Sequence, residues 1–522
     1  MKPDRIQVIK AVAASPLCWI TAGFFLWLSW ICADDWNNNP NYSYGWIITV
    51  ISIFFLYRRL IETPFERPNV IKYATPVSRA LWLAPVTILI LELVRMTPIH
   101  WRPITWSIFF TGAGVLLGMV YLALGKKGLK ALFFPVFFLS LAIPWPSFIE
   151  ITIIREFSFL LAAIAGEVLL LLGTYAEVQG KVIELSNGSV GVDEACSGLR
   201  SLQAALMVGF ALGEWFRFPL RWRVFFVVIS VLVGFAINIV RTITLSLLVA
   251  KGGSAAFDQW HDTVGLISMI GLTLTIAGLG SWITKHLTLA LPPQNQQSLW
   301  HEHSRWIPKS NFSIALTAAS LVAFCIPYFW YHWNEASTSA DSPFLGTSSW
   351  NEDIRILEPA DNISEVLRHD SGGYLKLPPP SGSEIVSYHF FWKPSAHNGK
   401  VLFHRPDVCM PGGGWIQNGP AEIITGKLNG RPTTVHKFDF SRGNIRSSLY
   451  WFCWIDELPV HFSGRPFSNV QLAFIPEFIR IGKRAFSVEL MGVMTQPHLA
   501  EKYTIHQVLA IHGKLDFEQD NP

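Results

Sequence analysis

Three residues of this sequence could form a nucleophilic site: Cys196, Arg241 and His261. Cys196 stands at the start of a predicted helix, where the helix dipole lowers a thiol pKa and free backbone N–H groups can hold an oxyanion. His261 could take a proton from that thiol and return it to a leaving amine. Each residue also has an ordinary interpretation, since Cys196 could be an inert buried thiol and His261 a loop histidine.

Arg241 lies inside the apolar run 222–250, about nine residues or roughly 13 Å from the outer end of that run. A charged side chain at such a depth costs at least ~2.5 kcal/mol, so it predicts a functional role. The alternatives are that Arg241 reaches the membrane interface or forms a structural ion pair. Arg200, four residues after Cys196 on the same helical face, is a second candidate for the arginine role.

The composition indicates a membrane protein. Of the 522 residues, 51% are hydrophobic and only 15% are charged, against roughly 25% in a typical soluble chain. The net charge of +4 comes from loops between apolar runs, which suits membrane orientation and not nucleic-acid binding. The six cysteines form no CxxC pair and no zinc spacing. Since the sequence also has no HExxH motif and no P-loop, we expect neither a metal nor a cofactor. We also expect no cleavable signal peptide, because Asp34 and Asp35 follow the first apolar run.

Ten apolar runs could form membrane helices, each of which needs about 20 mostly apolar residues. They lie near 17–33, 44–57, 80–96, 104–124, 131–146, 159–175, 197–216, 222–250, 264–284 and 312–333. If all ten crossed, the basic cluster 217–223 would lie outside, against the positive-inside rule. We therefore predict that 147–175 is interfacial or re-entrant. About nine spans then remain, and 176–196, the loop 251–263 and everything after 333 lie outside.

Residues 177–193 predict a small β-hairpin on the outer side. Val182, Ile183 and Leu185 precede Asn187-Gly188, which is typical of a type I′ turn. This hairpin would deliver the chain to Cys196 at the mouth of the next helix.

The C-terminal part has a different character. We predict a membrane domain over 1–311, a final helix over 312–333, a linker over 334–342 and an outer β-rich α+β domain over 343–522. Four runs with alternating or β-branched and aromatic character predict strands: Glu384–Trp392, Thr433–Phe440, Ser447–Ile455 and Arg484–Val493.

The segments Glu194–Arg200 and Asn238–Arg241, together with His261, resemble the exosortase/archaeosortase family over about 17–290. The resemblance implies a sortase-like transpeptidase with Cys196, Arg241 and His261 as catalytic residues. It implies an enzyme of the bacterial inner membrane that acts at the periplasmic face. The expected substrates are secreted proteins with a C-terminal sorting signal, made of a Pro-Glu-Pro type motif, a membrane helix and a basic cluster. Membrane lipids are the other expected partners, and exopolysaccharide production the expected context.

The segment His404–Trp415 is similar to the motif of the exosortase-associated C-terminal domain, found separate or fused. Cys409, with His404 nearby, could be a second reactive thiol or a disulfide partner of Cys453, since an oxidising compartment permits either. A structural role, or close backbone approach to a ligand through its three glycines, is also open.

Three other functions remain as alternatives. The chain could be a non-enzymatic membrane component of exopolysaccharide assembly or export, in which Arg241 binds an anionic lipid or sugar phosphate. It could be an intramembrane protease that uses water as acceptor. A secondary transporter ranks last, because the sequence has no inverted repeats or paired broken helices.

Overall fold

The computed structural model describes most of the chain in two compact units. The membrane unit comprises Met1–Glu92 and Trp101–Ile326, and the C-terminal unit comprises Leu93–His100 and Pro327–Pro522. The described residues are 16–39, 41–62, 74–99, 101–192, 198–286, 311–334, 356–357, 367, 369–377, 385–395, 398–403, 405–412, 414–428, 430–456, 458–460, 475–495 and 515–517. The predicted linker 334–342 therefore lies, apart from its first residue, outside the described residues, and the predicted domain boundaries stay predictions.

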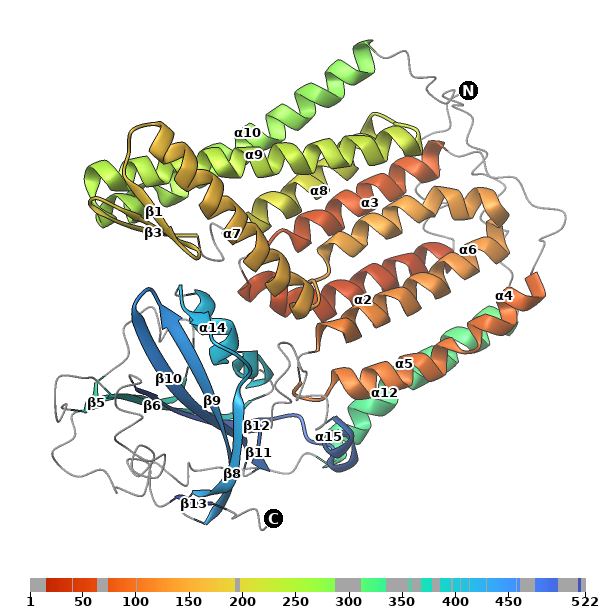
Figure 1. The fold of residues 1–522 in the computed structure, drawn as a ribbon. Helices are drawn as coiled ribbons and strands as arrows, with labels where there is room; N and C mark the ends of the chain where they lie inside the picture. Colours follow the sequence, from red (N-terminus) through yellow and green to blue (C-terminus); the bar gives the residue numbers. More distant parts are fainter. Residues whose placement is uncertain are drawn as a thin grey trace. The chain divides into compact units, whose positions relative to one another are not determined.

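Helices, most of them long, form the membrane unit (Figure 1). They are α2 (Pro16–Asn38), α3 (Gly45–Glu62), α4 (Ala74–Leu81), α5 (Ala84–Arg95), α6 (Arg102–Leu139), α7 (Ser147–Leu171), α8 (Leu199–Trp215), α9 (Leu220–Gly252), α10 (Ser254–His286) and α12 (Asn311–Asn334). The last residues of α5 and of α12 belong to the C-terminal unit. Five described segments are long and apolar enough to cross a membrane: Ala74–Arg95, Arg102–Ala142, Leu220–Gly252, Ser254–His286 and Ile314–Asn334. The polytopic helical character is confirmed, and the number of nine spans stays a prediction.

Helix α6 is two helical arms that fold back on each other at Gly125, whose φ of 63° and ψ of −156° are not helical. The Trp106 indole donates a hydrogen bond to the Pro144 carbonyl, 38 residues away, at 2.9 Å. In one straight helix that separation would span about 57 Å. The two arms therefore run in opposite directions, as Figure 1 shows, and they correspond to the predicted segments 104–124 and 131–146.

Helix α7 runs obliquely to its neighbours in the membrane unit (Figure 1). Its Glu150 is buried and forms an ion pair with Arg102, whose guanidinium group also lies 5.2 Å from the centre of the Tyr42 ring. The interfacial placement of 147–175 stays a prediction.

A three-stranded antiparallel sheet follows α7: β1 (Ala176–Gln179), β2 (Val182–Leu185) and β3 (Gly188–Gly191). The predicted turn at Asn187-Gly188 is wrong. Leu185 pairs with Gly188, so the two turn residues are Ser186 and Asn187, and neither has the positive φ that a type I′ turn requires. A second turn, at Gly180-Lys181, has a positive φ at Gly180. It divides the first half of the predicted hairpin into two strands, β1 and β2.

Buried apolar residues hold this small sheet against α7 and α9. Ile183 and Val190 pack with Leu161 of α7 and with Leu245 and Val249 of α9. The end of the membrane unit that carries the sheet is called the sheet end below, and the chain enters α8 from it.

At its other end, α8 is tied to its neighbours by charge. The buried Glu214 carboxylate forms ion pairs with Arg59 of α3 at 2.5 Å and with Arg223 of α9 at 2.7 Å. One carboxylate bridging two arginines fixes the position of α8 between two helices.

The C-terminal unit is built on one antiparallel sheet of ten described strands, in the order β13-β8-β9-β10-β12-β6-β5-β4, with β11 on β10 and β7 on β9. The strands are β4 (Ile356–Leu357), β5 (Ser371–Leu377), β6 (Ile385–Ser395), β7 (Ile416–Gln417), β8 (Glu422–Leu428), β9 (Arg431–Arg442), β10 (Ile445–Ile455), β11 (Leu458–Pro459), β12 (Phe486–Thr495) and β13 (Leu515–Phe517). Two short helices, α14 (Pro406–Gly412) and α15 (Ile475–Ile481), complete it. The predicted β-rich domain is confirmed.

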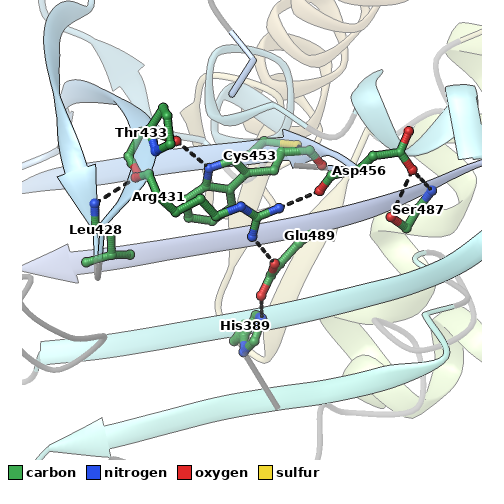
Figure 2. Close-up of polar contacts among 10 residues, drawn as sticks. His389, Leu428, Arg431, Thr433, Cys453, Asp456, Ser487 and Glu489 are labelled. Carbon is green, nitrogen blue, oxygen red and sulfur yellow. Dashed lines mark hydrogen bonds and ion pairs between the residues drawn. The ribbon is translucent and has the colours of Figure 1, made fainter. Parts of the chain in front are cut away.

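A buried ionic network crosses the centre of this sheet (Figure 2). Glu489 on β12 accepts from His389 on β6 at 2.8 Å and pairs with Arg431 on β9 at 2.6 Å. Arg431 also donates to the Asp456 carbonyl and lies 4.5 Å from the centre of the Trp454 ring. Since His389 and Glu489 are almost wholly buried, the network joins three strands inside the core.

Candidate active site

Arg241 and His261 meet between two adjacent helices. Arg241 lies on α9 and His261 on α10, and the helices are joined through Gly253, whose φ is +73°. The Nη2 atom of Arg241 lies 3.0 Å from Nε2 of His261. The antiparallel pair thus places a buried cation against an imidazole at the sheet end.

The predicted outer loop 251–263 is wrong. Helix α10 begins at Ser254, so His261 lies two turns inside a helix and not in a loop. Gly253 adopts a left-handed φ that few other residues tolerate, and this one residue makes the whole turn. A helical setting gives His261 a more fixed direction than a loop would.

The partners of His261 determine where its proton lies. A guanidinium group only donates, so Nε2 must be the acceptor from Arg241. The neutral ring then carries its hydrogen on Nδ1, which lies 3.0 Å from Oδ1 of Asp262 and donates to it. Asp262 was not singled out from the sequence, although its position directly after His261 was a usable signal.

Gly265 makes room for the Arg241 side chain. A β-carbon on Gly265 would lie 3.4 Å from Nη2 of Arg241 and 3.7 Å from its Cζ. Gly265 is one helical turn after His261, so both face α9. Sequence reasoning missed this glycine, and its spacing of four residues from His261 was the available signal.

Substitutions at Gly265 should therefore have a graded effect. Gly265→Ala adds one methyl group at ordinary contact distance, and we expect activity within about twofold of wild type. Gly265→Leu should displace the guanidinium group and lower activity at least about tenfold, since small displacements of positioned groups are costly. Initial rates of the two variants at equal protein in membranes check this, and equal rates for Ala and Leu would contradict it.

Cys196 and His404 lie outside the described residues. The first described residue after Cys196 is Gly198, which caps α8 with a left-handed φ of +86°. The description of α8 thus begins at its N-cap, two residues after the predicted nucleophile.

Arg200, the second candidate for the arginine role, contacts a residue outside the Arg241–His261 pair. Its Nε donates to Oδ1 of the buried Asn41, between α2 and α3, at 3.0 Å. Of the two candidate arginines, Arg241 is the one in contact with His261.

Cys409 and Cys453 are free thiols, so the predicted disulfide alternative is wrong. Cys453 lies on β10 inside the core. Cys409, on α14, keeps solvent contact, yet burial of its thiol, with a contribution from the Asp407 carboxylate, raises its pKa to about 11. A thiol is mostly protonated below its pKa, so Cys409 is a poor nucleophile at neutral pH.

The reactivity of Cys409 should follow that pKa. We expect its alkylation by iodoacetamide to rise with pH up to a midpoint near 11, with well under ~1% of the thiol ionised at pH 7.5. Peptide-level mass spectrometry after timed alkylation of the intact chain gives the profile. A midpoint below pH 8.5 would restore Cys409 as a candidate nucleophile.

Within the described ranges, no group of three or more His, Cys, Asp or Glu side chains could hold a metal ion. The groups that the site offers are a guanidinium donor and an imidazole. The absence of a metal and of a cofactor stays a prediction.

The comparisons with known proteins bear on the membrane unit. Residues 36–278 match the family described as transmembrane exosortase. No curated protein and no solved structure matches the chain. The matched residues run from α2 into α10, include Arg241 and His261, and end before the C-terminal unit. The fusion to an exosortase-associated domain therefore stays a prediction. The chain is a multi-pass membrane protein whose residues 36–278 match the transmembrane exosortase family.

Proposed function

We propose that this chain is a membrane cysteine transpeptidase that cleaves the C-terminal sorting signals of secreted proteins. The observation that carries the proposal is the contact of Arg241 with His261, in a unit of the transmembrane exosortase family. Cys196 is the proposed nucleophile, because it precedes the start of α8 by three residues.

The first half of the reaction forms a thioester. In the substrate-free site, Arg241 donates to Nε2 of His261. When a peptide carbonyl enters, the guanidinium group donates to the carbonyl oxygen instead and frees Nε2. The Cys196 sulfur bonds to the carbonyl carbon as its proton moves to Nε2, and Arg241 stabilises the oxyanion. The C–N bond then breaks, and His261 returns the proton to the leaving amine.

The second half resolves the thioester. An amine or hydroxyl acceptor at the cell surface attacks the carbonyl carbon and gives its proton to His261. The C–S bond breaks and the thiol regains that proton. Water in the place of this acceptor gives hydrolysis and so a peptidase.

The proposed location is the periplasmic face of the bacterial inner membrane. Basic residues near the Glu214 end of α8 suit the cytoplasmic side, and this supports an outer location for the sheet end. The proposed substrates carry a Pro-Glu-Pro type motif, a membrane helix and a basic cluster, and the proposed context is exopolysaccharide-associated protein sorting.

Thioester trapping tests the proposal. The intact chain is co-expressed with a secreted protein that bears a Pro-Glu-Pro type signal, and membranes are searched for a covalent adduct that hydroxylamine releases. We expect the adduct in wild type and in Cys409→Ala, and its loss in Cys196→Ala.

Other outcomes overturn the proposal. An adduct lost only in Cys409→Ala moves the chemistry to the C-terminal unit. If no adduct forms and the substrate matures normally in Cys196→Ala, the chain is better described as a non-enzymatic component of exopolysaccharide assembly or export.

A further inference from the structure

Asn238 is a polar side chain buried next to the start of α8. It is only 1% exposed and lies on α9, one turn before Arg241. Residues three apart share a helical face, so Asn238 and Arg241 face the same side of α9. Burying an amide is costly unless it makes polar contacts, whereas an aliphatic residue of that size would pack there without this cost.

The amide of Asn238 lies against Gly198. A β-carbon on Gly198 would be only 2.8 Å from Nδ2 of Asn238. Gly198 has a left-handed φ of +86° and offers no side chain to cap α8. Glycine is required there twice, by its backbone conformation and by the approach of Asn238.

Two other close contacts in the α8–α9 interface are between small residues. A β-carbon on Gly209 of α8 would lie 2.9 Å from the hydroxyl oxygen of Ser230, and one on Gly234 of α9 would lie 2.9 Å from Cβ of Ala205. Ser230 is as buried as Asn238, but its hydroxyl bonds back to Phe226 in its own helix at 2.8 Å. Near the start of α8, by contrast, the close contact with Gly198 is made by a larger amide, that of Asn238.

We propose that Asn238 is a positioning residue, whose amide fixes the turn at Gly198 and so holds the start of α8, to which the proposed nucleophile Cys196 is connected two residues earlier in the chain. The inference rests on the proposed function. The connection is short. Cys196 precedes Gly198 by two residues, the Asn238 amide occupies the space that a β-carbon on Gly198 would need, and Asn238 precedes Arg241 by one turn. Asn238 itself forms no bond to substrate.

The test compares Asn238→Leu, which keeps the branching and the number of side-chain heavy atoms but removes the amide, with Asn238→Asp and Ser230→Ala. The first readout is the pH profile of Cys196 alkylation in the intact chain, resolved by peptide-level mass spectrometry. We expect Asn238→Leu to move the midpoint upward, toward the ordinary cysteine pKa of about 8.5. Asn238→Asp should move it less. Ser230→Ala, which alters the same interface two turns away, should leave it unchanged.

The second readout is the rate of thioester formation at saturating substrate. Loss of positioning should lower it about 10²-fold in Asn238→Leu, with little change in the substrate concentration at half-maximal rate. We also expect the double variant Gly198→Ala/Asn238→Ala to lose less of the rate than the combined losses of the single variants Gly198→Ala and Asn238→Ala. The smaller side chain at position 238 makes room for the methyl group added at position 198.

The two readouts separate the inference from the proposed function. If wild type forms no thioester but Asn238→Leu still shifts the Cys196 profile, the transpeptidase proposal fails and the positioning role stands. If Asn238→Leu keeps the wild-type profile, or Ser230→Ala shifts it equally, the positioning role is overturned. If Asn238→Leu does not fold, Asn238→Asp with an unchanged profile and rate overturns it as well.

Discussion

Arg241→Gln should lower thioester formation by about 10²–10³-fold, the usual loss on removal of one oxyanion donor. Arg241 is only 8% exposed, and its Nη2 lies 3.0 Å from Nε2 of His261, so a charge that develops beside it is poorly screened by water. Gln keeps a hydrogen-bond donor but no charge. Arg241→Lys keeps the charge without the planar fork, and we expect an intermediate loss.

Single-turnover adduct formation in membranes measures this prediction. Arg155→Gln is a suitable control, because Arg155 forms an exposed pair with Glu156 on α7, and it should keep the wild-type rate. Arg200→Gln tests the other candidate arginine. A loss in Arg200→Gln with a normal rate in Arg241→Gln would move the oxyanion role to α8 and refute the assignment.

Glu489→Ala should destabilise the C-terminal unit by about 3–5 kcal/mol, the cost of leaving buried charges without their partner. Glu489 holds both His389 and Arg431, and these side chains would stay inside the sheet after its removal. For a unit of this size the loss corresponds to a fall in midpoint temperature of about 10 °C. Glu489→Gln keeps an acceptor and should cost less.

Thermal unfolding of the intact chain, followed by proteolysis of the C-terminal unit, measures the effect. Glu477→Ala is the matched control, because Glu477 and Arg480 form an ion pair at the surface, where such pairs contribute little. If Glu489→Ala and Glu477→Ala unfold at the same temperature, the buried network does not stabilise the sheet.

Much of the fold follows from hydrophobic pattern alone. Apolar runs of about 20 residues located the membrane helices, including the two arms of α6, because each run must be long enough to cross a bilayer. Alternating and β-branched runs located β6, β9, β10 and β12 to within a few residues. Both signals arise because buried positions need apolar side chains, so the order of apolar residues along the chain shows which segments are buried.

The connections were harder to predict, because single residues decide them. Gly253 turns the chain between α9 and α10 without a loop, so a helix begins where an outer loop was expected. In the small sheet, the pairing of Leu185 with Gly188 overrides the turn preference of Asn187-Gly188. Here backbone pairing outweighs a local dipeptide signal.

The site was predictable in its residue types and not in its contacts. Arg241 stood out because a charged side chain inside an apolar membrane run costs free energy. His261 stood out because imidazole side chains can act as acid or base near neutral pH. That they touch depends on the depth of each residue in its helix, which follows from the turn at Gly253. Gly265 leaves room for the Arg241 side chain, and Asn238 fills the space beside Gly198. Such packing depends on which helices are neighbours, which a single sequence does not show.

The turn at Gly253 also has a consequence for biogenesis. Arg241 and His261 are separated by only 20 residues and lie on one helical hairpin. Contacts between residues so close in the chain carry a small loop-closure cost and form early. This half of the site can therefore assemble as soon as the α9–α10 hairpin enters the membrane, before synthesis of the C-terminal unit is complete.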